Sequence, residues 1–256
     1  MLGAIAGDII GSPYEFISFK GYDFPLFSKQ SDYTDDTVLT VAVADILMHD
    51  REIAATLKSY TRQYPNRGYG GNFARWVASD SLEPYNSWGN GAAMRTSPVG
   101  FLFTNEVDVL AAARDIAQAT HNHPEGIRGA QALAYAIFLA RQGAGKEELR
   151  TEITRWFGYD LSPKLEDIRP SYRFDESCQG TVPPALIAFL ESADFEDAIR
   201  KAISLGGDAD TLACITGSVA EAYFGPIPQE IAQQTRQRLP RAFLEVIDKF
   251  YLMLEA

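Results

Sequence analysis

The sequence predicts an all-α fold, built as a single compact, orthogonal multi-helix domain. Most of the chain repeats apolar residues at helical spacing, and no segment alternates apolar and polar residues as a half-buried strand does. Residues 22–27 have some extended character, but Pro25 weakens that segment as a strand. The 256 residues, 46% of them hydrophobic, are enough to bury a full core. Because we find no linker, internal repeat or low-complexity tract, we predict one domain over residues 1–256.

The individual helices follow from apolar spacing and from the residues that flank it. The segment 35–48 is apolar on nearly all sides, which indicates a buried helix, whereas 51–64 is amphipathic. Gly143 and Gly145 end an alanine-rich helix that precedes them. The other predicted helices span residues 106–119, 125–142, 146–157, 184–191, 195–205, 209–224, 229–239 and 242–254.

One long stretch lacks helical spacing. Residues 158–182 are rich in Pro, Ser, Asp and Tyr, so we predict a long loop there. Loops of that length in compact domains often carry function. Pro184, just after this loop, and Pro240 stand where we place first helical turns, which tolerate proline.

Composition excludes several classes of protein. The net charge of −11 argues against proteins that bind nucleic-acid backbones or anionic membranes, since both need a basic face. No stretch approaches the ~20 apolar residues of a membrane span, and Asp8 interrupts an N-terminal run that has no basic start. Cys178 and Cys214 form no disulfide framework and are expected to be reduced and partly buried. We expect a cytoplasmic monomer.

Two acidic clusters each open an apolar helix. The first comprises Thr34, Asp35, Asp36 and Thr37. The second lies within the sequence from Gly206 to Thr211 and comprises Asp208, Asp210 and Thr211. Helix capping is the plain alternative, since Asp and Thr are favoured at helix N-termini. One cap needs a single side-chain oxygen, however, whereas each cluster supplies two carboxylates and a hydroxyl.

A bound cation would explain this surplus of carboxylates. Unpaired buried carboxylates are costly, and no lysine or arginine lies within several residues of either cluster. Carboxylate and hydroxyl oxygens suit Mg²⁺ or Mn²⁺, whereas the clusters lack the histidine and thiolate ligands that zinc prefers. If folding brings the two helix starts face to face, four carboxylates and two threonine hydroxyls have room for two ions about 3.5–4 Å apart.

A third segment, from Tyr85 to Arg95, has two glycines among small residues just before a helix. Such a backbone can approach a phosphate and offer it exposed N–H groups. A tight turn is the alternative interpretation. Trp88 in this segment either stacks on a base or belongs to the core.

Two further segments contain candidate polar groups. His121 and His123, two of only three histidines in the chain, stand between two predicted helices. Either a structural role or contact with a ligand is compatible with that position. Glu15 lies between aromatic residues after a proline turn, as a surface carboxylate or as a group that contacts substrate.

Taken in order, five motifs resemble those of the ADP-ribosylglycohydrolase family. The resemblance covers positions 3–225, almost the whole chain, and the ordered set is far more specific than any one motif. The motifs are Gly7-Asp8 with Gly11-Ser12-Pro13-Tyr14-Glu15, Thr34-Asp35-Asp36-Thr37, Gly89-Asn90-Gly91-Ala92-Ala93-Met94-Arg95, Thr120-His121, and Gly206-Gly207-Asp208-Ala209-Asp210-Thr211.

The resemblance implies an all-α fold with a binuclear Mg²⁺ or Mn²⁺ centre at the floor of a cleft. The positions that match the family's metal ligands are Thr34, Asp35, Asp36, Asp208, Asp210 and Thr211. The positions that match its diphosphate loop are Ser87, Trp88, Gly89, Asn90 and Gly91, with Trp88 near the adenosine end. Glu15 matches a glutamate that lies over the metals near the scissile bond in part of the family, and His121 matches a histidine at the distal ribose.

The implied reaction is hydrolysis of the bond between ribose C1″ and an acceptor, which reverses mono-ADP-ribosylation of a protein side chain. The transition state should resemble an oxocarbenium ion. The candidates for taking a proton from water are Glu15, Asp35, Asp36 and Asp208. Some arginine-specific bacterial members carry an acidic residue where Ser87 stands, so the resemblance leaves the acceptor open.

Three alternatives remain on the sequence alone. The first is an ADP-ribose-binding pseudoenzyme. The second is a hydrolase of free ADP-ribose derivatives such as O-acetyl-ADP-ribose, and the third is a structural protein whose acidic clusters only cap helices. Both acidic clusters are complete, which favours activity. Metal dependence of melting would argue against the third alternative.

Overall fold

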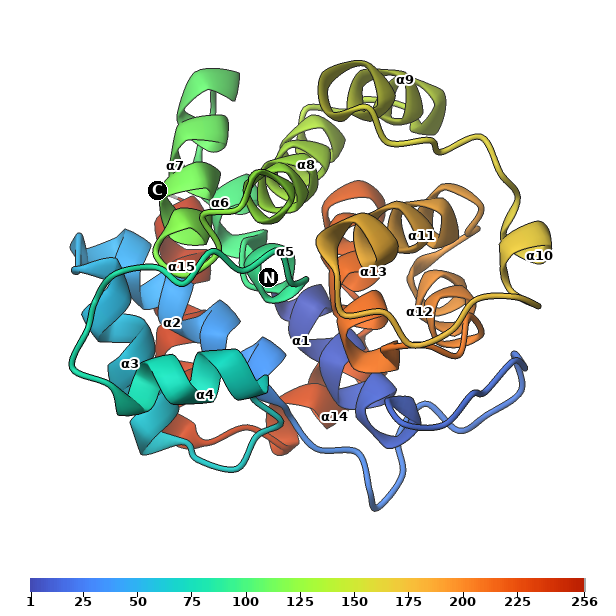
Figure 1. Ribbon diagram of the computed structural model, residues 1–256. Helices are drawn as coiled ribbons and strands as arrows, with labels where there is room; N and C mark the ends of the chain where they lie inside the picture. The colour runs from blue at the N-terminus through green and yellow to red at the C-terminus, as the bar shows by residue number, and fades with distance from the viewer. Residues whose placement is uncertain (256) are drawn as a thin grey trace.

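A computed structural model describes residues 1–255, and within them all regular structure is helical (Figure 1), as predicted. The helices are α1 (Leu2–Gly11), the 3-10 turn η1 (Ser12–Tyr14), α2 (Asp35–His49), α3 (Ile53–Gln63), α4 (Gly71–Ala78), α5 (Gly91–Met94), α6 (Ser97–Leu102), α7 (Glu106–Gln118), α8 (Pro124–Arg141), α9 (Lys146–Phe157), α10 (Leu165–Ile168), α11 (Cys178–Leu190), α12 (Phe195–Ile203), α13 (Ala209–Phe224), α14 (Gln229–Gln237) and α15 (Arg241–Leu254).

The predicted long loop ends earlier than expected, because α11 begins at Cys178 and not at Pro184. The Ser177 side chain caps this helix by accepting a hydrogen bond from the backbone N–H of Gly180 at 2.9 Å. Pro184 lies inside the helix and has no N–H to offer the carbonyl of Gly180. That carbonyl accepts a hydrogen bond from the Tyr172 hydroxyl at 2.9 Å instead. The proline that suggested a helix start is therefore tolerated in the interior.

Five helices lie outside the predicted ranges, namely α1, α4, α5, α6 and α10, although a helix was expected just after the two glycines of the segment from Tyr85 to Arg95. All but α1 are short, and α10 lies within the predicted loop. Helix α1 contains three glycines in ten residues, which lowers its intrinsic helix propensity. Its packing explains why it forms, since all of its residues except Leu2 are buried.

Helices α1 and α13 lie side by side at the centre of the molecule (Figure 1), and glycine permits their close approach. A Cβ atom on Gly7 would stand 2.0 Å from the carbonyl oxygen of Ala213. On Gly3 the corresponding distance, to the oxygen of Gly217, is 2.4 Å. A Cβ atom on Gly11 would stand 2.6 Å from the carbonyl oxygen of Ala209, at the start of α13. These glycines recur every four residues, so they share one face of α1.

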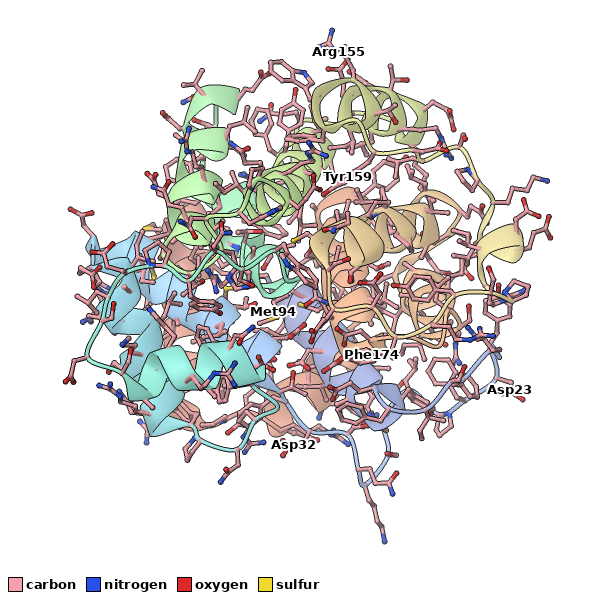
Figure 2. All side chains as sticks on the ribbon, in the orientation of Figure 1. Asp23, Asp32, Met94, Arg155, Tyr159 and Phe174 are labelled. Atoms are coloured by element: carbon pink, nitrogen blue, oxygen red, sulfur yellow. The ribbon has the colours of Figure 1, made fainter. Side chains whose placement is uncertain are left out.

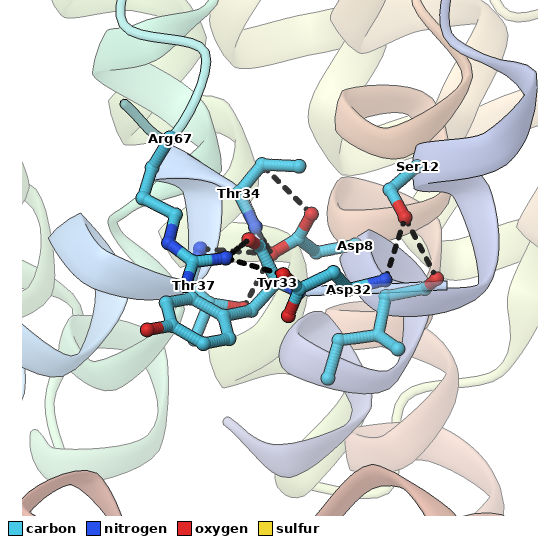
Figure 3. A network of polar contacts seen from close by, with 8 residues as sticks. Asp8, Ser12, Asp32, Tyr33, Thr34, Thr37 and Arg67 are labelled. Atoms are coloured by element: carbon cyan, nitrogen blue, oxygen red, sulfur yellow. Dashed lines mark hydrogen bonds and ion pairs between the residues drawn. The ribbon is translucent and has the colours of Figure 1, made fainter. Parts of the chain in front are cut away.

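Asp8, also on α1, holds the first turn of α2 (Figure 3). Its buried carboxylate accepts hydrogen bonds from the backbone N–H of Thr34 at 3.0 Å and of Thr37 at 3.1 Å. Both threonine hydroxyls donate to it as well, that of Thr34 at 2.7 Å. The backbone N–H of Asp35 donates to the carbonyl of Arg67 at 2.7 Å. Helix α1 therefore carries the starts of both α2 and α13, so the two acidic clusters converge.

Buried apolar side chains form one continuous cluster that extends from Met1 to Phe250. Cys178 and Cys214 are free thiols, as predicted, and they are fully buried where partial burial was expected. None of the helices within residues 1–255 has the length and apolar character needed to cross a bilayer. One domain over residues 1–256, whose last residue lies outside the described part, stays a prediction, as does the monomeric, cytoplasmic state.

Candidate active site

The predicted site residues surround one cavity of about 260 Å³. All of them except Thr34 line it. The lining residues from the predicted set are Glu15, Asp35, Asp36, Ser87, Trp88, Gly89, Asn90, Gly91, His121, Asp208, Asp210 and Thr211. Met94 and Phe174, which also line the cavity, lie near the middle of the molecule (Figure 2). Segments far apart in the sequence thus meet where the resemblance implies a cleft.

Carboxylates from three segments form the acidic side of this cavity. Oxygen atoms of Glu15, Asp208 and Asp210 lie within 4.8 Å of one another. The Thr211 hydroxyl donates to Asp36 across the two helix starts, at 3.4 Å. The side-chain amide of Asn90 donates to Asp208 at 2.7 Å, which ties the glycine-containing segment to the acidic cluster.

Thr34 differs from the other predicted ligands. Its hydroxyl donates to Asp8 and accepts a hydrogen bond from the backbone N–H of Asp36 at 3.3 Å, as an N-cap does. The capping alternative therefore describes what this hydroxyl does in the structure. A role for Thr34 as a metal ligand stays a prediction.

The acidic cluster lacks a protein cation. Within residues 1–255 no lysine, arginine or histidine forms an ion pair with Asp35, Asp36, Asp208 or Asp210. One oxygen of Asp36 is buried without any hydrogen-bond partner. Burial and then mutual repulsion raise the pKa of Asp35, Asp36 and Asp210 well above the ordinary range. An all-oxygen donor set with an orphaned carboxylate oxygen fits a hard divalent cation.

The backbone around Gly206 holds the segment that carries Glu15. Gly206 has a φ of +61°, and a Cβ there would stand 2.4 Å from the carbonyl oxygen of Phe19. Lys20 donates to the carbonyls of Leu205 and, at 2.8 Å, of Tyr172. The segment that carries Glu15 is therefore held against the chain before α13 by the close approach of Gly206 to Phe19 and by the Lys20 ammonium group.

Burial raises the pKa of Glu15 to about 7, and repulsion from Asp208 and Asp8 adds to the shift. A raised folded-state pKa means that stability present below the unfolded pKa of about 4.5 is lost as pH rises toward 7. In EDTA, we expect the melting temperature of Glu15→Gln, relative to that of the wild type, to increase as the pH rises from 4.5 to 7. Thermal unfolding followed by circular dichroism at several pH values measures this difference. Glu148→Gln, which removes an exposed carboxylate on α9, is the control. A difference between Glu15→Gln and wild type that does not change with pH would contradict the expectation.

The segment from Ser87 to Gly91 forms another part of the cavity wall, next to the acidic cluster. The backbone N–H of Asn90 donates to Glu176 at 2.7 Å, and that of Cys178 donates to Trp88 at 3.0 Å. These bonds tie the segment to the end of the predicted loop, which supplies Phe174 and Glu176 to the cavity. Trp88 is 45% exposed, so it is not a core residue.

His121 lies in the cavity wall, where its ring centroid is 5.9 Å from that of Tyr85. The side chain is buried, and desolvation followed by the charge of Arg95 holds its pKa well below the ordinary value. The imidazole is therefore neutral at pH 7. His123 instead caps α8, since its side chain accepts a hydrogen bond from the backbone N–H of Glu125 at 3.1 Å.

Sequence reasoning missed two polar residues of this site. Asp8 was interpreted only as a break in an apolar run, although it follows Gly7 in a matching motif. Arg95 lines the cavity fully buried, and two of its nitrogens, Nε and Nη1, have no partner among the described residues. It ends the motif Gly89 to Arg95, which was the available signal for it.

Comparison with known proteins agrees with this geometry. A family model described as ADP-ribosylglycohydrolase matches residues 1–255. The chain belongs to the ADP-ribosylglycohydrolase family. The family resemblance drawn from the sequence motifs is thereby confirmed.

Several members of the family align with most of this chain. ADP-ribosylhydrolase ARH3 of Danio rerio is 26% identical over 305 residues, which cover 88% of this chain and 81% of that protein. ADP-ribosylarginine hydrolase Tri1 of Pseudomonas putida is 27% identical, over 88% of this chain and 69% of its own length. A solved structure titled ADP-ribosylglycohydrolase-related protein complex superposes with a TM-score of 0.70 at 26% identity, and covers 99% of this chain and 95% of that one.

Proposed function

We propose that this ADP-ribosylglycohydrolase family member is a metal-dependent hydrolase that cleaves the glycosidic bond between ADP-ribose and an acceptor on a protein. One observation carries the proposal. Two helix starts place Asp35, Asp36, Asp208 and Asp210 around one cavity, and no described lysine, arginine or histidine forms an ion pair with any of them. The same cavity is also lined by the segment from Ser87 to Gly91. An acidic floor and a backbone-lined wall suit a ligand that combines ribose hydroxyls with a diphosphate.

The residues that we propose to hold two Mg²⁺ or Mn²⁺ ions are Thr34, Asp35, Asp36, Asp208, Asp210 and Thr211. When bound, such ions orient substrate hydroxyls and lower the pKa of a water molecule. Asn90 orients one of these ligands, since it donates to Asp208. The segment from Ser87 to Gly91 binds the diphosphate and orients the ribose, with Trp88 exposed beside it for the adenosine end.

Glu15 is our candidate for the group that takes the proton from the attacking water. Its carboxylate lies beside Asp208 and Asp210, and no described residue donates a hydrogen bond to it. As the water oxygen bonds to C1″ and the bond from C1″ to the acceptor breaks, the proton passes through Glu15 to the leaving acceptor. Asp35, Asp36 and Asp208 are the alternative bases. Glu15→Gln separates them, since it removes the base and leaves the six proposed ligands intact.

The acceptor is tested with a panel of substrates. Arginine-linked, serine-linked and O-acetyl-linked ADP-ribose are incubated with the protein in Mg²⁺, in EDTA, and in EDTA followed by excess Mg²⁺ or Mn²⁺. We expect release of ADP-ribose from at least one protein-linked substrate, loss of release in EDTA, and recovery with the added ion. Tight ADP-ribose binding without turnover would show a pseudoenzyme. Turnover of the O-acetyl derivative alone would show a hydrolase of free ADP-ribose esters.

A further inference from the structure

We infer that Arg95 and Thr120 are positioning residues that fix His121 as a neutral imidazole protonated on Nε2, so that Nε2–H donates to a ligand oxygen in the cavity. The tautomer follows from hydrogen-bond geometry alone. The role of Nε2–H toward a ligand rests on the function proposed above.

Arg95 sets the direction of the first hydrogen bond. Its guanidinium is fully buried, and Nη2 donates to the Thr120 hydroxyl at 2.8 Å and to the carbonyl of Ile116 at 2.9 Å. A guanidinium has donors only and stays protonated in proteins. The oxygen of Thr120 must therefore be the acceptor in this contact.

The Thr120 hydroxyl in turn determines whether Nδ1 of His121 accepts or donates a hydrogen bond. Its hydroxyl is fully buried and lies 2.7 Å from Nδ1 of His121. If Nδ1 donated, the hydroxyl oxygen would accept twice and its own proton would be buried without an acceptor, because no other described group within reach accepts it. An unsatisfied buried donor is costly, so the hydroxyl donates to Nδ1. The single proton of the neutral ring is then on Nε2.

The protonated nitrogen lies against the segment that contains Gly89 and Gly91. Nε2 would stand 3.3 Å from a Cβ placed on Gly91 and 3.5 Å from one placed on Gly89. His121 lines the cavity, and with glycine at both positions no Cβ stands against this nitrogen. No residue from 1 to 255 accepts a hydrogen bond from it. The ring therefore presents a fixed donor, which suits a phosphoryl or hydroxyl oxygen and rejects a ligand that offers only N–H at this point.

The tautomer is read directly by two-dimensional ¹H–¹⁵N NMR of the imidazole nitrogens in the full-length protein at pH 7. The chain has three histidines, His49, His121 and His123, so the spectrum of His121→Gln assigns the signals. We expect the pattern of a neutral ring with Nε2 protonated. A ring protonated on Nδ1, or on both nitrogens, would overturn the inference. This measurement uses the unaltered protein and needs neither metal nor substrate.

The chain of hydrogen bonds from Arg95 through Thr120 to His121 is tested by Thr120→Val, which removes the hydroxyl and nearly keeps the shape of the side chain. We expect the Nδ1 resonance to shift as it loses its donor, and calorimetry to show ADP-ribose binding weakened about three- to tenfold, the effect of one hydrogen bond. The matched control is Thr216→Val, which removes another fully buried hydroxyl, one that donates to Ala185 at 2.9 Å on α11. The control should change neither reading.

The outcomes separate this inference from the proposed function. Wild-type ADP-ribose affinity in Thr120→Val would overturn the positioning role. If the wild type itself fails to bind ADP-ribose, the proposed function is wrong. The NMR measurement of the His121 tautomer then still decides whether Arg95 and Thr120 act as inferred. The same spectrum decides the matter if Thr120→Val does not fold.

Discussion

Replacement of Asp208 by Asn should reduce turnover by more than about a hundredfold, because even residues that only orient metal ligands change affinity or activity by 10–100-fold. The reason is loss of a proposed ligand, not loss of structure. Asp208 is the N-cap residue of α13, its side chain makes no capping hydrogen bond, and Asn is equally favoured at such a position. An Asn oxygen also keeps the hydrogen bond from Asn90.

Stability should change in the opposite direction from activity. In EDTA, Asp208→Asn relieves repulsion among carboxylates whose pKa burial raises, so its melting temperature should equal or exceed that of the wild type. On addition of Mg²⁺ or Mn²⁺ the wild type should gain stability and the variant should gain less. Asp35→Asn is expected to behave in the same way.

A matched variant controls for the helix cap. Asp194→Asn alters the N-cap of α12, an exposed aspartate whose side chain accepts from the backbone N–H of Asp197 at 2.8 Å. Its turnover and its metal-induced stabilisation should equal those of the wild type. Wild-type turnover and metal affinity in Asp208→Asn would refute the proposed metal centre.

Gly7→Ala should have the largest effect on stability. An alanine in a helix normally stabilises by up to about 1 kcal/mol relative to glycine. At Gly7 the added Cβ would stand 2.0 Å from a backbone carbonyl of α13, and backbone cannot move aside as a side chain does. We expect a loss of about 3 kcal/mol or more in the free energy of unfolding, at or above the upper range for overpacking.

Urea unfolding measures this effect. Gly71→Ala at the start of α4 is the control, because its Cβ would meet only the tip of Arg75 at 3.9 Å. That variant should be neutral or slightly stabilised. If Gly7→Ala unfolds at the same urea concentration as the wild type, α1 and α13 are not held at contact distance. Because α1 also carries Asp8, metal-induced stabilisation should fall together with stability.

Much of the fold and of the candidate site was predictable from local signals. Asp35 and Asp208 each stand at the start of a helix that is apolar on nearly all sides. An acidic cluster in that position can be recognised from its own segment of the sequence. Helix α1 was not predictable from periodicity, because its glycines are explained only by their close approach to the backbone of α13. Arg95 and Asp8 were missed for a similar reason. Their hydrogen-bond partners lie 21 or more positions away, and spacing along one chain segment does not reveal them.

The contact between Asp36 and Thr211 has a thermodynamic consequence. The two residues are 175 positions apart, so an unfolded chain has no preformed site, and either half alone offers two carboxylates. A cation that needs both halves binds only the native state, and its full binding free energy is added to stability, about 2.7 kcal/mol at a hundred times its dissociation constant. We expect the supply of that cation to set both the rate of catalysis and the fraction of chains that escape proteolysis.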